Sequence, residues 1–411
     1  MIRSGKPPRT HVHQRRDLTP PSRLSFRSGV SIHSHTQFSK ESLGFIPHYA
    51  SRIPWISGCV DKACQEYRSK NGVELDFSRA YWTPPFGPNE VWLSELKQIE
   101  QALGLFALIS ITDHDNIDAA KTMSNRLPIS LEWTVPYRDG YFHLGIHNID
   151  AAHEEAIVRE LARFTEGCSE CSALDLLSVL HGSPETLVVF NHPLWDVERL
   201  GAEAHRQALQ AFLAEHHEFI HAIEINGFRP WKENLEVLSL GESWAIPVVA
   251  GGDRHGASPN TVLNLSAATS MKEFVTELRE DRISHVLLMP SYGEPMLTRQ
   301  LGIAGDAVRR YPGHPPERQH WADRVFFRDH NDRVLPLSQQ VTKDLPAWLK
   351  FVAMVLQGLG NRSLHHVVHA ISPTREGRLP QIEPRRAPFP APHQSFHRSS
   401  YGTLREESGR Q

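Results

Sequence analysis

Short apolar runs that end in polar, chemically reactive side chains recur along the first two thirds of the chain. Val30–Ile32 leads into His33-Ser34-His35, and Phe106–Ile111 leads into Thr112-Asp113-His114-Asp115. Short apolar runs bounded by turn-forming or polar residues predict buried strands. Between several of them lie stretches with apolar residues three and four positions apart, which predict amphipathic helices. This alternation of strands and helices predicts an α/β fold.

Three further runs end in the same way. Pro128–Leu131 ends in Glu132, Leu187–Phe190 in Asn191-His192-Pro193, and Val248–Ala250 in a glycine pair followed by Asp253, Arg254 and His255. Residues two apart on an extended chain face the same side, so Asp253 and His255 are expected to point together, as are the two imidazoles of the first motif. In α/β proteins the carboxyl ends of parallel strands form the site. Carboxylate and imidazole groups that converge from several strands predict a divalent metal site.

The order of these motifs resembles that of the PHP (polymerase and histidinol phosphatase) superfamily, over about Gly29 to Pro290. The motifs that carry the resemblance are His33-x-His35, Thr112–Asp115, Glu132, His143, Asn191–Pro193 and Gly252–His255. They are specific as a set and weak singly. The resemblance implies a distorted (β/α)7 TIM-like barrel that holds two or three divalent metal ions (zinc, manganese or iron) and hydrolyses phosphoesters.

The resemblance also implies a set of metal ligands: His33, His35, Glu132, His143, His192 and Asp253, with His114, His255 and Glu41 at a third site. Glu132 would bridge two metals. His143 is preferred over His147, which lies on the same face of its strand, because of the family's spacing after the glutamate.

The third metal site is where the sequence departs from the family pattern. Family members place an Asp or His shortly after the first motif, where this chain has Lys40 and Glu41. Glu41 could supply an oxygen, whereas a charged Lys40 would repel a cation. A shift of one residue on an extended chain turns a side chain to the opposite face, which favours two metals over three. Without the third metal, His114 and His255 would act on the substrate.

The chemistry expected at paired metals is phosphoryl transfer. Two metals about 3.5–4 Å apart clamp the attacking and leaving oxygens and lower the pKa of a water molecule. The candidate catalytic residues are Glu132, His114, His255 and Asp113. Asp113 and Asp115 could also orient imidazoles. Arg254 and Arg229 are candidate substrate-binding residues because guanidinium matches phosphate, with a surface salt bridge as the alternative for each.

The remaining segments have weaker signals. Residues 1–28 form a basic tail and residues 372–411 are rich in Pro, Arg and Ser, so both are predicted to be disordered. The barrel, residues 29–290, contains a long insertion at 36–89 that is either a lid over the site or a packed subdomain. Residues 291–371 form a partly helical extension whose apolar helix, Asp344–Leu359, is expected to dock on the barrel.

Composition limits the class of protein. The chain has 411 residues, of which 40% are hydrophobic and 22% charged, and this fits a soluble globular protein. A net charge of -3 does not favour nucleic acid as the main partner.

No apolar run approaches the ~18 residues of a membrane span, so no membrane association is expected. Four cysteines without a secretory signal indicate a reducing, cytoplasmic location. The expected partner is a small phosphorylated substrate or nucleotide, and the oligomeric state is left open.

Two other functions remain open from the sequence. One is an amidohydrolase-like metal enzyme acting on C–N bonds. Such enzymes usually carry a metal-bridging lysine, and none stands at a suitable strand end. The other is a non-catalytic metal-binding barrel that serves as an interaction module. A purely structural site would not need an open position for water, which argues against it.

Overall fold

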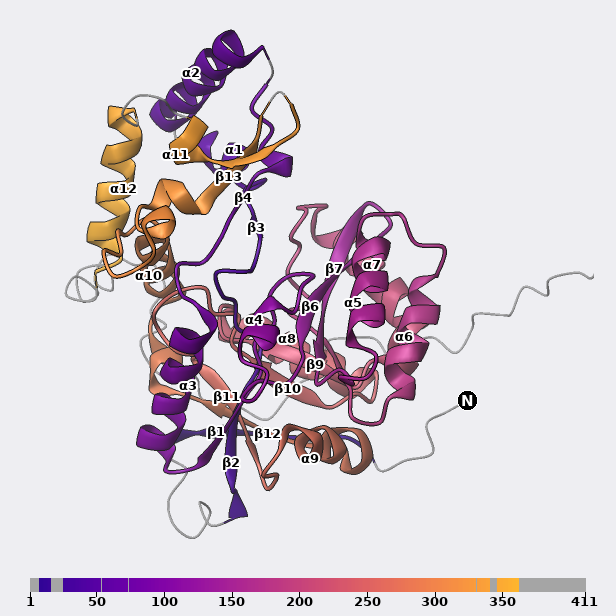
Figure 1. Ribbon diagram of the computed structural model, residues 1–411. Coiled ribbons are helices and arrows are strands. Elements are labelled where there is room, and N and C mark those ends of the chain that lie inside the picture. Colours follow the sequence, from indigo (N-terminus) through magenta and orange to yellow (C-terminus); the bar gives the residue numbers. More distant parts are fainter. Residues whose placement is uncertain are drawn as a thin grey trace, which may run out of the picture.

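The computed structural model describes residues 7–15, 25–52, 54–72, 74–329, 331–340 and 346–361, and their arrangement is shown in Figure 1. The described strands fall into three sheets. The first has the order β1 (Arg9–Gln14), β12 (Ile283–Leu288), β11 (Val262–Ser266), β2 (Ser28–Ser31) and β5 (Phe106–Ile109). The second has the order β10 (Val248–Gly251), β9 (Ala222–Asn226), β8 (Leu187–Phe190), β7 (Gly140–His147) and β6 (Leu131–Tyr137).

Helices alternate with these strands, so the predicted α/β class is confirmed. The helices are α3 (Pro88–Leu103), α4 (Asp118–Thr122), α5 (Glu154–Thr165), α6 (Ala173–Gly182), α7 (Ala202–His216), α8 (Trp231–Ser243) and α9 (Met271–Thr276). α3 packs on β5, α5 on β6, α6 on β8 and α8 on β9. The helices bury their apolar stripes against the strands, as Leu209 and Phe212 of α7 do beside Phe190 of β8.

The strands are not all parallel, in contrast to the barrel implied by the family resemblance. β2–β5, β8–β9 and β9–β10 pair in parallel, whereas β6–β7 and β7–β8 are antiparallel. The turn between β6 and β7 spans two residues, of which Arg138 has a φ of 54°. A loop this short can join only antiparallel strands.

The described ladders form separate sheets and do not close into one ring. Isolated parallel bridges link the first sheet to the second at two places, Ser34 to Arg254 and His114 to Glu132. Each bridge lies inside one of the motifs identified from the sequence. The two larger sheets therefore meet where the candidate ligands are.

The strand around Glu132 differs from its prediction. The sequence pattern places its end at Glu132, but β6 begins at Leu131 and continues to Tyr137. Trp133 and Val135 are fully buried on the face opposite Glu132, so the alternation continues past the carboxylate. His143 lies within β7 and is paired with Thr134. These two candidate ligands thus come from inside a hairpin, not from strand ends.

The prediction of a disordered tail over residues 1–28 is wrong for Arg9–Gln14. This segment forms β1, which pairs in parallel with β12 from Arg9 opposite Ile283 to Gln14 opposite Leu288. The ladder satisfies backbone hydrogen bonds, and Val12 packs against the core, so few apolar side chains are needed. Residues 1–6 and 16–24 and the predicted C-terminal tail, 372–411, lie outside the described residues.

The insertion and the C-terminal extension together form a separate small unit above the two larger sheets in Figure 1. Its antiparallel sheet has the order β14 (Val334–Pro336), β13 (Val325–Arg328), β4 (Tyr81–Trp82) and β3 (Glu41–Ser42). Around it lie α1 (Ile46–Ala50), α2 (Pro54–Asn71), α10 (Met296–Ala307), α11 (Leu337–Gln340) and α12 (Ala347–Leu359). Leu43, Ala80 and Phe327 make its core. The insertion thus forms a packed subdomain, and strands β13 and β14 of the extension complete its sheet.

The apolar C-terminal helix does not dock where the sequence suggested. α12 packs mainly on α10, which belongs to the extension itself. The two helices approach closely where Gly305 faces Gly360, and a Cβ at Gly360 would lie 2.8 Å from the Cα of Gly305. In the described part of the chain, no helix has both the length and the hydrophobicity to cross a membrane.

Candidate metal centre

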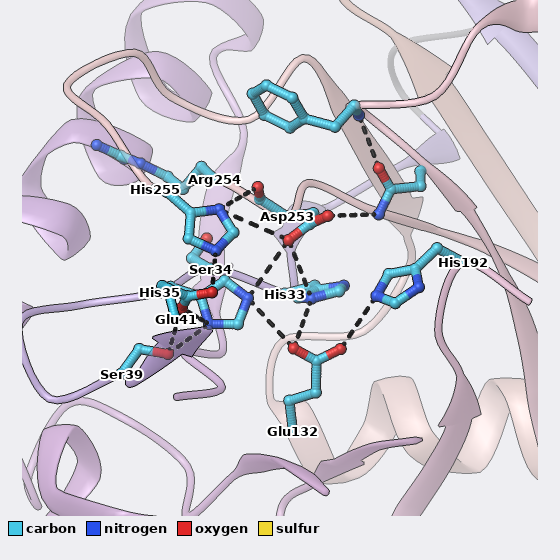
Figure 2. A network of polar contacts seen from close by, with 12 residues as sticks. His33, Ser34, His35, Ser39, Glu41, Glu132, His192, Asp253, Arg254 and His255 are labelled. Carbon is cyan, nitrogen blue, oxygen red and sulfur yellow. Dashed lines mark hydrogen bonds and ion pairs between the residues drawn. The ribbon is translucent and has the colours of Figure 1, made fainter. Parts of the chain in front are cut away.

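Histidines from both larger sheets converge on the two carboxylate oxygens of Glu132 (Figure 2). Three imidazoles lie near Oε2: His33 at 3.2 Å, His35 at 3.3 Å and His114 at 3.5 Å. Two lie near Oε1: His192 at 3.3 Å and His143 at 3.4 Å. Glu132 is 1% exposed, so its carboxylate has almost no contact with water and is surrounded by these imidazole rings instead. One carboxylate therefore faces two separate sets of nitrogen donors.

Among the residues that the structure describes, candidate ligand atoms form four groups of three, with the atoms of each group within 4.8 Å of one another. The groups are His33, His35 and Asp253; His33, Glu132 and His192; His35, His114 and Glu132; and His35, Glu41 and His255. His143 adjoins them, with its Nδ1 3.4 Å from His192 Nε2. The structure thus brings all nine ligands implied by the family resemblance into one cluster.

Two nitrogens of the cluster are buried without a hydrogen bond. Among the described residues, neither His35 Nε2 nor His114 Nδ1 has a partner of suitable geometry. The other nitrogen of His35, Nδ1, lies 3.1 Å from Ser39 Oγ, whose hydroxyl donates to Glu41 Oε1 at 2.6 Å. Ser39 Oγ is therefore left to accept the Nδ1 proton, which leaves Nε2 as a lone pair aimed into the cluster. A buried, unpartnered imidazole lone pair beside carboxylates fits a divalent metal.

Glu41 enters the cluster from the small unit, at the start of β3. Its Oε2 lies 3.0 Å from His255 Nε2 and 3.5 Å from His114 Nε2, and its Oε1 lies 3.5 Å from His35 Nδ1. Lys40 turns away, with its ammonium 5.7 Å from the centre of the Tyr81 ring. Neighbouring residues point to opposite sides, as the period of an extended chain requires, and here it is the carboxylate that points inward.

Outer carboxylates and amides hold the ligands in place. Glu224 Oε2 lies 2.6 Å from His33 Nδ1, so His33 offers Nε2 to the cluster, and Glu224 Oε1 accepts from the backbone of His192 at 3.3 Å. Asn191 donates to Glu132 Oε1 at 2.9 Å, and Asn226 donates to Asp253 Oδ2 at 3.3 Å. Such partners fix the tautomer and orientation of ligands. Glu224 and Asn226 lie at the end of β9, after an apolar run like those before the other ligands, whereas no sequence pattern marks Ser39.

The glycine pair before Asp253 is required by close packing. A Cβ at Gly251 would lie 1.8 Å from Glu224 Oε2, and one at Gly252 would lie 1.7 Å from the side chain of Asn260. Gly251 therefore makes room for the carboxylate that orients His33, and Gly252 makes room for Asn260.

Several ligands occupy strained backbone positions. The φ angles of His33, Asp253 and His192 are 64°, 53° and 26°, in the region that favours glycine. The chain is thus not extended at His33 or at Asp253. The expectation that His33 and His35, and likewise Asp253 and His255, lie on one face of an extended strand is therefore wrong, although both pairs are in the cluster. His255 Nδ1 lies 3.7 Å from Asp253 Oδ1. Strain of this kind persists where the surroundings over-determine it, typically at functional sites.

The two aspartates of the second motif do not face the ligands. Asp113 accepts hydrogen bonds from the backbone and hydroxyl of Thr36 at 2.5 and 2.6 Å. Burial raises its pKa to about 7, against these hydrogen bonds. Asp115 accepts from the backbone of Thr134 at 2.8 Å. Asp113 thus holds the loop after His35, and Asp115 holds strand β6. Neither carboxylate orients an imidazole, so the structure does not support Asp113 as a catalytic residue.

The two candidate substrate-binding arginines are engaged elsewhere. Arg254 is 3% exposed, and its side chain points away from the cluster in Figure 2. Its Nη1 donates to Glu95 at 2.8 Å. Arg229 donates to both carboxylate oxygens of Glu233, at 2.7 and 2.8 Å. Neither arginine is directed at the cluster: Arg229 forms a partly exposed salt bridge, as its alternative predicted, whereas the salt bridge of Arg254 is buried and not on the surface.

The electrostatics of the cluster favour a bound cation. Burial acts against the charged form of His114, but Glu132 and Glu41 outweigh it and raise its pKa to about 10. Burial likewise opposes the ionised form of Glu132, yet His33 and His143 hold the pKa of Glu132 well below its usual value. Burial and His255 lower the pKa of His35 to about 4, which keeps this ligand neutral. The low pKa of Glu132 and the neutral state of His35 match the protonation states that metal binding requires, whereas His114 is protonated near neutral pH and would have to release its proton to a metal.

Comparisons with known proteins give only distant similarities. No protein-family model and no curated protein matches the chain. One similar structure is that of a proposed metal-dependent phosphoesterase from Bifidobacterium adolescentis, at 15% identity and a TM-score of 0.30, covering 57% of this chain and 90% of that one. Another is an amidohydrolase from Chromobacterium violaceum with bound sulfate and no metal, at 16% identity and a TM-score of 0.27, covering 42% and 83%. Scores this low assign neither a family nor an activity to the chain.

Proposed function

We propose that the protein is a metal-dependent phosphoesterase that hydrolyses a phosphomonoester or phosphodiester of a small molecule or nucleotide. The observation that carries the proposal is the division of donors around Glu132. His192 and His143 lie at Oε1, whereas His33 and His35 lie at Oε2. A carboxylate with imidazoles at each oxygen is suited to bridge two metals, and paired metals suit displacement at phosphorus.

Each residue of the cluster has a role in this proposal. Glu132 would be a ligand shared by both metals, His33, His35 and Asp253 would hold one of them, and His143 and His192 would hold the other. Divalent metals would supply Lewis-acid polarisation of the phosphoryl group and a lowered pKa for water. His114 and His255 are each 15% exposed, more than the buried ligands around them, so they stand closest to an incoming substrate.

A third metal site is part of the proposal, in place of the two-metal state favoured by the sequence. His35, Glu41 and His255 offer ligand atoms within 4.8 Å of one another, and His114 lies beside them. Because Arg254 and Arg229 are held by other carboxylates, the negative charge of a phosphate would be balanced chiefly by metals. We also propose that the two isolated bridges close the two larger sheets into a distorted barrel around this cluster.

The test is a Glu132→Gln variant, compared with Glu203→Gln on the exposed surface of α7 as its matched control. Metal content and hydrolysis of a panel of phosphate esters are measured with zinc, manganese or iron added. Wild type and Glu203→Gln should bind at least two metals and hydrolyse part of the panel, whereas Glu132→Gln should lose metal and activity while keeping its fold by circular dichroism. Hydrolysis of amides but not of phosphate esters by the wild type would replace this proposal with the amidohydrolase alternative. Full metal content without hydrolysis would favour a binding module.

A further inference from the structure

An exposed indole stands at the rim of the cluster. Trp195 follows β8 and the Asn191-His192-Pro193 motif, and its backbone N–H donates to the carbonyl of His192 at 2.9 Å. Its ring centre lies 5.0 Å from that of His192, at an interplanar angle of 67°. His192 is 5% exposed, whereas Trp195 is 38% exposed. The indole therefore adjoins a candidate metal ligand at one edge and is open to solvent elsewhere.

The indole of Trp195 makes a cation–π contact with an arginine. The guanidinium of Arg229 lies 5.3 Å from the centre of the Trp195 ring. The same guanidinium donates hydrogen bonds to both carboxylate oxygens of Glu233. A cation over an indole and a bidentate ion pair each fix geometry. Exposed tryptophans without such support lose conformational freedom when they bind a ligand. This one is already ordered, which reduces the cost of binding.

Two more aromatic rings border the cluster on other sides. Tyr141 stacks on His143 with ring centres 5.1 Å apart, and Trp82 lies 6.1 Å from His255. Both are only half-buried. In Figure 2, His192 and His255 lie on different sides of Asp253 and Glu132, and each of them has an aromatic ring beside it. Aromatic rings thus lie beside three of the candidate ligands, although the cluster itself is strongly polar.

We infer that Trp195 is the platform on which a planar aromatic ring of the substrate stacks while its phosphoester group lies at Glu132. The inference rests on the proposed phosphoesterase function and narrows its substrate class to phosphate esters that carry a nucleobase or an aryl group. Stacking of a base on an aromatic side chain contributes about 1–3 kcal/mol, which corresponds to roughly 5- to 150-fold in binding. Alternatively, Trp195 only positions His192, in which case its loss would weaken metal binding and lower activity on all substrates equally.

The experiment compares two substrates whose leaving groups are of the same chemical type. Adenosine 5′-monophosphate and ribose 5-phosphate both release a primary alkoxide and differ in the base. The ratio of their kcat/KM values is measured for wild type, Trp195→Leu, Trp195→Phe and Trp55→Leu, which removes an exposed indole of α2. We expect the ratio to fall about tenfold in Trp195→Leu, to stay near wild type in Trp195→Phe and to be unchanged in Trp55→Leu. Arg229→Met should lower it less than Trp195→Leu.

Benzyl phosphate and ethyl phosphate give the second arm. A fall of the benzyl-to-ethyl ratio in Trp195→Leu without a fall of the nucleotide ratio would identify an aryl group as the ring. An unchanged ratio in both arms would overturn the inference, as would an equal loss of metal and of all activities in Trp195→Leu.

A binding measurement separates this inference from the proposed function. Adenosine has no phosphate, and its contact with the metal-loaded protein is read by saturation-transfer NMR. If the wild type hydrolyses none of the esters but adenosine contact is lost in Trp195→Leu, the phosphoesterase proposal fails and the platform stands. If adenosine contact is the same in Trp195→Leu and wild type and both ester ratios are also unchanged, the platform fails.

Discussion

Glu132 and Gly145 lie opposite each other in the register of the β6–β7 hairpin, and Asn191 reaches Glu132 across the space that a side chain at Gly145 would fill. A Cβ at Gly145 would lie 2.8 Å from His147 Nε2 and 2.9 Å from Asn191 Oδ1. Both distances are shorter than van der Waals contact, so a methyl group there must displace one of two buried polar side chains. The central carboxylate thus depends on a residue without a side chain.

Gly145→Ala should therefore lower metal affinity and destabilise the fold by about 1–3 kcal/mol, the usual cost of overpacking a filled site. The measurements are metal titration and denaturant unfolding with and without chelator. Gly182→Ala is the control, because a Cβ there meets no atom within 4 Å. Metal affinity in Gly145→Ala equal to that of the control would show that Asn191 does not support Glu132.

The number of bound metals should depend on Glu41 and not on its neighbour. Glu41→Gln removes the charge that faces His255 at 3.0 Å and His114 at 3.5 Å, so the stoichiometry should fall from three metals to two. Lys40→Ala, which alters a side chain directed at Tyr81, should keep three. Elemental analysis of both variants decides the point. Two metals in the wild type would restore the state that the sequence favoured.

The position of Glu41 also shows where sequence reasoning stops. The spacing after His35 identified Glu41 as a candidate oxygen, but its direction depends on β3, a strand of two residues paired with β4. β4 in turn pairs with β13, more than two hundred residues later in the chain. Two-residue strands have no periodicity to read, and a pairing this distant leaves no local signal.

The ligands themselves could be predicted because apolar runs stop abruptly before them. His33, His192 and Asp253 follow β2, β8 and β10 within two residues. Orientation was less predictable, since the positive φ of these residues turns the side chains in a way that no alternation rule gives. Arg254 has the right chemistry and the right place in the sequence for phosphate, yet Glu95 of α3 draws it to the other side. This partner can be identified only when the position of α3 relative to the strands is known.

A histidine cluster remote from the metal site should make the fold sensitive to acid. His285 of β12 stacks with His11 and His13 of β1, with ring centres 4.8 and 5.3 Å apart. Burial, and then the charges of His13 and His11, lower the pKa of His285 to about 4. In the unfolded chain this pKa is about 6.5. Between these values the unfolded state binds more protons, so stability should fall as the pH drops from about 6.5 to 4.

The variant for this prediction is His285→Phe, which keeps an aromatic ring for stacking and removes the titration. Urea unfolding is followed at several pH values in the presence of chelator, so that histidines of the metal site contribute equally to both proteins. The wild type should lose more stability than His285→Phe over the window from pH 6.5 to 4. Parallel losses in the two proteins would remove His285 as the cause.

Arg254 should matter for stability and not for recognition of phosphate. Its guanidinium donates to Glu95 at 2.8 Å and to the carbonyl of Gly256 at 2.8 Å, and both partners are away from the cluster. Arg254→Met would leave Glu95, which is fully buried, without its cation. Removing one member of a buried ion pair typically costs about 3–5 kcal/mol. Arg254→Met combined with Glu95→Gln should recover part of that loss, because no buried charge is then unpaired. Denaturant unfolding of the single and double variants measures both effects, and KM for any phosphate ester that the wild type hydrolyses should stay within about twofold in those that fold. A large rise in KM at unchanged stability would show instead that Arg254 turns towards the substrate.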